Sequence, residues 1–172
     1  VATAPTPQAV TLAQHQAFVR LPEPGYTPRR WDPRSGSFEV LFADYAQPIA
    51  ADLDIRWLVR HRLEKVDPSA PRSRVKEPIV YYVDPNTPKK WVEWVKRGIE
   101  EWKPAFEAAG FRNAIIAKEA PSPEEDPDWS AEDVRYSVIR WLPSTIENAN
   151  GPHVHDPRSG EILEADVNFY HN

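Results

Sequence analysis

PKKWVEWVKRGIEEWKPAFEAA, residues 88–109, is the stretch that decides how the rest of the chain folds. On a helix of 3.6 residues per turn, its apolar residues fall on one face and its charged residues on the other. The apolar face consists of Trp91, Trp94, Val95, Gly98, Ile99, Trp102, Ala105, Phe106 and Ala109. The pattern predicts a long amphipathic helix whose aromatic stripe is buried.

The two ends of this helix carry boundary signals. Thr87 can serve as the N-cap, and Pro88 suits the first helical position, where its missing N–H would have no partner anyway. Gly110 can adopt the left-handed conformation that closes a helix. Pro104 removes one backbone hydrogen bond, so we expect a kink there within a helix that continues.

Short apolar runs flank the helix and supply a surface for it to cover. Residues 79–83 (IVYYV) precede it and residues 114–117 (AIIA) follow it, and both are typical of strands covered on both faces. A strand–helix–strand order predicts a crossover unit with two parallel strands and a right-handed connection. The predicted fold class is therefore α+β, a twisted mixed sheet with a backing helix at about 88–109.

The remainder of the chain adds strands on both sides of this unit. We expect strands at residues 15–21 and 38–45 and a stronger one at 134–142. Residues 53–65 could form a strand or a helix, and their alternation, broken at Leu58, favours a strand. The stretch 153–155 and the alternating run 161–170 indicate a hairpin at the rim of the sheet.

A proline-containing, linker-like segment at residues 67–73 divides the chain into two predicted parts. Residues 1–70 are predicted to be the end of a β-rich domain with a flexible N-terminus. Residues 71–172 are predicted to be the upper part of a second domain. The pentapeptide DPRSG occurs at 32–36 and again at 156–160, and we interpret it as a turn signal rather than an internal repeat.

Composition limits the classes of function. The net charge is −5 with interleaved signs, so no basic stripe suggests nucleic acid. No apolar run approaches the roughly 18 residues that a membrane span needs. Cysteine is absent, which excludes disulfides and thiol chemistry. Methionine is absent too, so Val1 is not a translation start, and we expect the chain to be a fragment.

Histidines and carboxylates are the candidates for chemistry. His153 and His155 would project to the same side of a strand and could form two thirds of a zinc site, but no third ligand is indicated by spacing, and exposed rim residues are the simpler interpretation. Glu161, Glu164 and Asp166 could form an acid–base pair or simply a solvated strand face. HExxH, GxSxG and phosphate-loop motifs are absent, so no catalytic or metal residue is predicted within this chain.

Two long stretches carry a family resemblance. Residues 76–141 (KEPIVYYVDPNTPKKWVEWVKRGIEEWKPAFEAAGFRNAIIAKEAPSPEEDPDWSAEDVRYSVIRW) and 151–172 (GPHVHDPRSGEILEADVNFYHN) resemble a family of uncharacterised bacterial zinc-dependent metalloproteases with a metzincin-like catalytic domain. Residues 18–40 (FVRLPEPGYTPRRWDPRSGSFEV) and 60–71 (RHRLEKVDPSAP) resemble the end of the β-rich domain that precedes it in that family.

The resemblance implies more than the residues alone. In metzincin-type proteases an upper subdomain of twisted sheet and backing helix precedes a zinc-binding helix with HExxH, which this chain lacks. Zinc is thus implied for the parent protein and not for the fragment. The edge strand above the cleft pairs with an extended peptide substrate, which implies substrate-binding roles for Gly151, His153, Val154 and His155. Export to the periplasm or the exterior is also implied.

Two functions follow from these observations. The first is the substrate-rim half of an exported zinc endopeptidase, which is inactive without the rest of the catalytic domain. The second is a non-catalytic peptide-binding or pro-region module that uses its sheet edge or the acidic loop at 119–130. An independent glycosidase or other hydrolase is a distant third.

Overall fold

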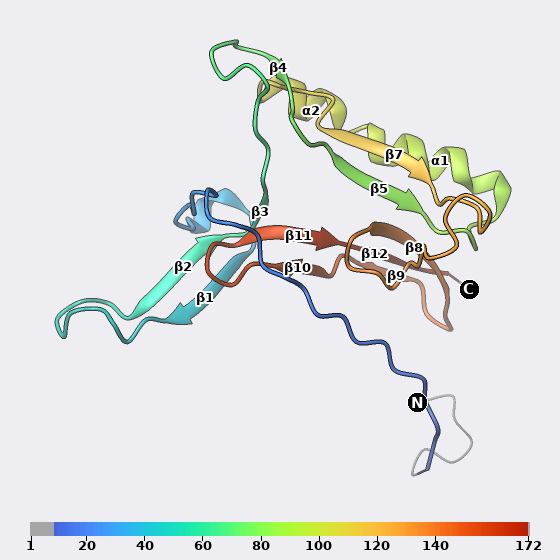
Figure 1. Ribbon diagram of the computed structural model, residues 1–172, viewed down its shortest axis with the longest axis horizontal. Coiled ribbons are helices and arrows are strands. Elements are labelled where there is room, and N and C mark those ends of the chain that lie inside the picture. Colours follow the sequence, from blue (N-terminus) through green and yellow to red (C-terminus); the bar gives the residue numbers. More distant parts are fainter. Residues whose placement is uncertain (1–8, 172) are drawn as a thin grey trace.

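The computed structural model describes residues 9–171 (Figure 1), and the flexible terminus predicted at residues 1–10 lies outside that range except for residues 9 and 10. The described chain is a mixed α+β structure built mostly of strands, which form several sheets. The strands are β1 (Glu39–Ala43), β2 (Asp54–Leu58), β3 (Arg60–His61), β4 (Ser73–Arg74), β5 (Ile79–Val83), β6 (Phe111–Arg112), β7 (Ile115–Glu119), β8 (Ser137–Pro143), β9 (Asn148–Asn150), β10 (His153–His155), β11 (Glu161–Ala165) and β12 (Val167–His171). The helices are a 3-10 turn at Pro33–Ser35, α1 (Lys89–Glu100) and α2 (Lys103–Ala108).

The main sheet has five strands in the order β7-β5-β8-β12-β9. The first four strands are parallel, and β9 is the antiparallel edge strand. Helix α1 lies between β5 and β7 in the chain and packs on these two strands (Figure 1). The predicted strand–helix–strand crossover with parallel strands is therefore present, and its core is Val83, Ile99 and Ile115.

The predicted helix is present as two consecutive segments. Helix α1 ends at Glu100 and α2 begins at Lys103. Pro104 has no N–H to donate to the Glu100 carbonyl, and its ring crowds that carbonyl, so the regular hydrogen-bond pattern is interrupted there. Just before the proline, the Trp102 N–H donates to the Ile99 carbonyl at 3.4 Å, and beyond it the Phe106 N–H donates to the Trp102 carbonyl at 3.2 Å. Pro104 then occupies the first turn of α2, where a missing N–H is tolerated. The expected interruption of a helix that continues is present, because Glu101 and Trp102, between the two segments, keep right-handed helical backbone angles.

The prediction of a buried aromatic stripe is wrong. Trp91, Trp94 and Trp102 are 42%, 60% and 63% exposed, whereas Ile99 is buried and Val92 and Val95 are partly buried against the core. The helix is turned so that its β-branched residues face the sheet. Because α1 covers only β5 and β7, the tryptophans on its flank extend beyond the strands that it covers.

The helix also begins differently from the prediction. Pro88, not Thr87, is the residue that precedes the first helical turn, and no side chain caps that turn. Thr87 is buried, and its backbone N–H donates to the Asp84 carbonyl at 2.9 Å. At the far end, Gly110 has a φ of 92°, as a closing glycine requires.

A second sheet, in the order β10-β11-β3, adjoins the main sheet through the nearly continuous strands β11 and β12. The predicted rim hairpin is present, because β10 pairs antiparallel with β11 and β9 with β12. The run 53–65 is strand in two pieces. The alternation breaks at Leu58, where the pairing of β2 with β1 ends. The next strand, β3, pairs with β11 instead.

The two DPRSG segments form the same turn. In each, the aspartate (Asp32 or Asp156) accepts from the backbone N–H and the guanidinium of the arginine two residues later. The closing glycines, Gly36 and Gly160, both have positive φ. The common sequence thus reflects common turn chemistry. The strand predicted at residues 15–21 is absent, since this stretch is extended and makes no ladder.

Candidate functional site

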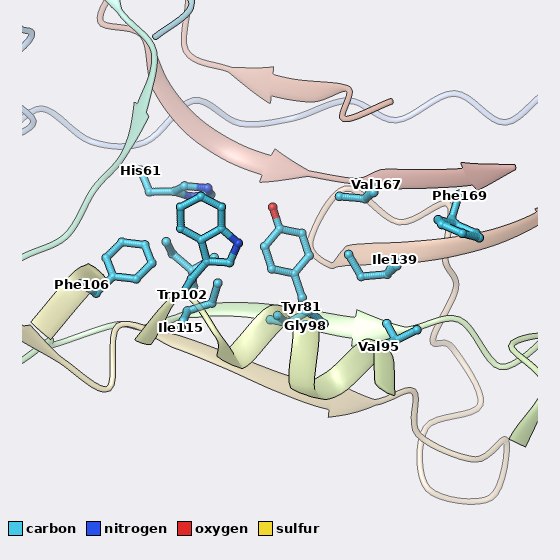
Figure 2. A pocket seen from close by; sticks show the side chains of 12 residues that line it. His61, Tyr81, Val95, Gly98, Trp102, Phe106, Ile115, Ile139, Val167 and Phe169 are labelled. Atoms are coloured by element: carbon cyan, nitrogen blue, oxygen red, sulfur yellow. The ribbon is translucent and has the colours of Figure 1, made fainter. Parts of the chain in front are cut away.

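An apolar groove runs between α1 and the half of the main sheet that α1 leaves uncovered (Figure 2). Its volume is about 520 Å³. Helix α1 and the break after it supply one wall, from which Val95, Gly98 and Trp102 face the space. Strands β8 and β12 supply the other wall through Ile139, Val167 and Phe169.

The groove continues toward the start of α1. A second depression of about 640 Å³ shares Val95, Ile139 and Phe169 with the first and extends it past Trp91 and Trp94. Its sheet wall is an aromatic stack in which the Trp141 ring lies 5.2 Å from Phe169 and 4.7 Å from His171, measured between ring centroids. One elongated apolar surface therefore follows α1 along its length.

This surface follows from the alternation of the strands. The residues of one parity on β8 and β12 point to the side of the sheet that carries α1. They are Ile139 and Trp141 on β8, and Val167, Phe169 and His171 on β12, all of which line the groove. The strands thus present an apolar face for which the described residues supply no second helix.

The rim predicted to bind a peptide lies along the edge of both sheets. Strand β9 ends the main sheet and β10 ends the second sheet, with Gly151 and Pro152 as the connection between them. The four predicted substrate-binding residues all fall on this edge: Gly151 is exposed, Val154 is 37% exposed, and His153 and His155 are half-buried. Residues 148–150 of β9, which precede them, are exposed.

Histidines gather near this edge without forming a metal centre. The rings of His153 and His155 lie 5.2 Å apart, and burial together with the neighbouring His155 lowers the pKa of His153. His61, on β3, is more enclosed, and burial followed by the charge of His153 lowers the pKa of His61 to about 4. Across residues 9–171, no group of three or more histidine and carboxylate side chains is placed to hold a metal ion.

The three carboxylates of β11 and its end are not a solvated face, contrary to the simpler expectation. Glu161 is buried; its Oε2 accepts from the Arg62 guanidinium at 2.8 Å, and its Oε1 lies 2.7 Å from the Arg62 Nε in an ion pair. Glu164 and Asp166 are half-buried and lie close to each other. Burial, a hydrogen bond with Asp166 and the charge of Asp166 together raise the pKa of Glu164 to about 8.

The groove, and the places of His61 and Tyr81 in its lining, were not predicted from the sequence. The sequence did contain a signal, because alternate residues of β8 and β12 are apolar. A single helix over β5 and β7 is too narrow to cover the apolar face that Ile139, Trp141, Val167 and Phe169 form. Helical periodicity predicts which residues share a face, but it does not indicate how many strands that face covers. The prediction that the tryptophans of 88–109 are buried was wrong for this reason.

Comparison with known proteins adds one match. Residues 2–66 match a domain of unknown function (DUF5117). No curated protein and no solved structure shows significant similarity to the chain. In the described range no helix has both the length and the apolar character required to cross a bilayer.

Proposed function

We propose that this chain forms the substrate-rim half of the cleft of an exported zinc-dependent metalloendopeptidase and is inactive by itself. The apolar groove beside α1 is the observation that carries the proposal. It lies on the same side of the sheet as α1, and an amphipathic helix is the element that fits such a surface. In metzincin-like proteases, which the sequence resembles, the zinc-binding helix follows the sheet.

The topology supports the same proposal. A cleft that binds an extended peptide needs a strand with an unpaired side, because the peptide adds as a further strand through main-chain hydrogen bonds. The edge from Asn148 to His155 provides that side in both sheets. The peptide would lie along Gly151, His153, Val154 and His155, and Pro152 would contribute no donor.

Zinc uptake in a longer protein is the decisive experiment. The reading frame beyond Asn172 is expected to encode HExxH within the next several dozen codons, and the extended protein is expected to hold one zinc ion per chain. Gly98→Leu places a side chain in the groove, where a Cβ meets nothing within 4 Å. This variant should lose zinc and peptidase activity, whereas Glu93→Leu, on the opposite face of α1, should keep both. Tight stoichiometric zinc or peptidase activity in the 172-residue chain alone contradicts the proposal.

A non-catalytic peptide-binding or pro-region module is the second candidate, and the exposed rim is the observation that favours it. The two candidates make different predictions about the groove. Half of a cleft should expose it to solvent, whereas a self-sufficient module should not expose a long apolar surface. A hydrophobic dye should bind the chain, and Trp94→Lys should weaken that binding while Glu93→Lys should not. Absence of dye binding, together with a cooperative unfolding transition, would favour the module.

Peptide addition at the rim has its own test. An extended peptide should bind the chain, and the same peptide with alternate backbone amides N-methylated should not bind, since it lacks the donors for strand addition. Equal binding of the two peptides would show that side-chain contacts elsewhere hold the peptide.

A further inference from the structure

Strand β1 is the outer strand of a ribbon that extends away from the main sheet (Figure 1). Its neighbour β2 is paired on both sides, with β1 along one of them. On the other side the Trp31 N–H donates to the Arg56 carbonyl at 3.0 Å, and the Leu58 N–H donates to a carbonyl at 2.8 Å, that of Arg29. Within the described residues β1 pairs only with β2, so one side of β1 is a free sheet edge.

The hydrogen bonds at the two ends of β1 show which of its residues face this edge. The Val59 N–H donates to the Phe38 carbonyl at 3.0 Å. The Asp44 N–H donates to the Leu53 carbonyl at 2.8 Å. In an antiparallel pair only every second residue exchanges hydrogen bonds with the partner strand, and here these are the even-numbered residues of β1. The backbone N–H and C=O groups of the alternate residues therefore point outward, and these residues are Glu39, Leu41 and Ala43.

This edge lacks the features that protect the other sheet edges. Natural edges are usually blocked by charged side chains, especially lysine, by proline or by a very short strand. Strand β7, at one edge of the main sheet, carries Lys118 and Glu119, and the rim at the opposite edge is interrupted by Pro152. Strand β1 contains no lysine or proline, and its one charged residue, Glu39, is held within the ribbon by Arg56 at 3.0 Å. Its outer side is therefore open to another strand.

We propose that β1 pairs with β1 of a second copy of this chain, antiparallel and centred on Leu41. In this register Leu41 lies opposite Leu41 of the second copy, and Glu39 lies opposite Ala43. All the outward N–H and C=O groups of the strand then have partners, because outward residues meet outward residues. No like charges face each other, since the only charged residue of β1 is opposite an alanine.

The side chains favour the same register. Val40 and Phe42 share one face of β1, and the register places Val40 of each copy directly opposite Phe42 of the other. Such pairs of an aromatic and a β-branched residue stabilise antiparallel sheets. Phe38, which is 78% exposed, lies diagonally across from Phe42 of the second copy and extends the apolar contact. A relative shift by two residues would leave one end of each β1 without a partner.

The assembly is complete with two copies. The far side of β2 is occupied by residues 29–31, so no further strand can add to the ribbon there. The pairing uses the same edge in both copies, which is the twofold arrangement that closes on itself. No residue of β1 lines the groove or belongs to the rim, so the inference is independent of the proposed peptidase.

Sedimentation equilibrium at increasing protein concentration tests the pairing. The mass should rise from that of one chain to that of two. Leu41 is 49% exposed, so Leu41→Lys leaves the single copy folded but places two positive charges opposite each other at the centre of the pair. It should raise the dissociation constant at least about tenfold. Ile49→Lys, at the fully exposed end of the hairpin, and Trp94→Lys, in the groove, should both leave the dissociation constant unchanged.

The absence of cysteine from the chain allows a direct test of the register. Leu41→Cys places two thiols at the twofold axis, where the Cα atoms of a hydrogen-bonded pair are about 5.5 Å apart, a distance that a disulfide can span. Ala43→Cys lies on the same face, but its counterpart is four residues away along the strand, roughly 13 Å. Mild oxidation should link the Leu41→Cys chains in pairs and leave the Ala43→Cys chains unlinked.

Three results would each overturn the proposal. The first is a chain that keeps the mass of a single copy at the concentrations used for NMR. The second is a Leu41→Lys variant that associates as tightly as the unmodified chain. The third is a Leu41→Cys variant that forms disulfide-linked pairs no faster than Ala43→Cys.

Discussion

Glycine at the end of a DPRSG turn has two different roles in this molecule. Gly36 and Gly160 share a left-handed backbone, with φ of 68° and 74°. A Cβ at Gly36 would meet nothing within 4 Å, whereas one at Gly160 would lie 2.7 Å from the Leu58 carbonyl oxygen. Gly36→Ala should therefore lower the free energy of unfolding only by the cost of placing alanine in the left-handed conformation, about 1–2 kcal/mol. Gly160→Ala should cost clearly more, because the backbone at Leu58, where β2 ends, must shift away from the turn before β11. Urea unfolding of the two variants measures the difference, and equal costs would contradict the close approach.

His61 makes the fold sensitive to acid. Its pKa is lowered to about 4 in the folded chain, so the unfolded chain binds the proton first as the pH falls from about 6.5. The free energy of unfolding should drop between pH 6.5 and about 4, by on the order of 2 kcal/mol, and should not recover below that range. His61→Gln should remove that part of the pH dependence. A variant with the same acid profile as the unmodified chain would show that His61 titrates normally.

Helix α1 shows at the element scale how burial differs between residues that share an apolar stripe. Ile99 is buried in the core, so Ile99→Ala should lower the free energy of unfolding by roughly 2–4 kcal/mol. Trp94 is 60% exposed and lies in the groove wall, so Trp94→Ala should change the free energy of unfolding by no more than about 1 kcal/mol. If thermal or urea unfolding gives Trp94 the larger effect, the helix is turned the other way.

The elements that the sequence predicts well are those with a purely local signal. The β5 and β7 strands, the helix between them and the turn at Asp156 follow from apolar runs, helical period and turn residues. The orientation of α1 does not, because burial of Trp94 depends on how many strands the helix spans. The half-buried state of Glu164 was also not predictable from its alternation, since alternation does not indicate what packs on each face of a strand.

At the scale of the whole molecule, specific contacts cross the predicted boundary near residue 70. Strand β3, within residues matched by the domain of unknown function, pairs with β11 near the other end of the chain. Tyr26 lies over the Arg60 and Arg62 guanidiniums, and Arg62 pairs with Glu161. Tyr26→Ala should therefore destabilise the whole fold, by roughly 2–4 kcal/mol in a single unfolding transition. A separate early transition confined to residues before 66 would contradict this coupling.

The central claim is that the groove beside α1 is one wall of a cleft whose metal is held by another segment. The most direct measurement is zinc content and peptidase activity, determined for these 172 residues and for the same chain extended along its natural reading frame. We predict no stoichiometric zinc and no cleavage for the former, and one zinc ion per chain with peptide cleavage for the latter. Zinc and activity in the 172-residue chain, or neither in the extended protein, would contradict the account.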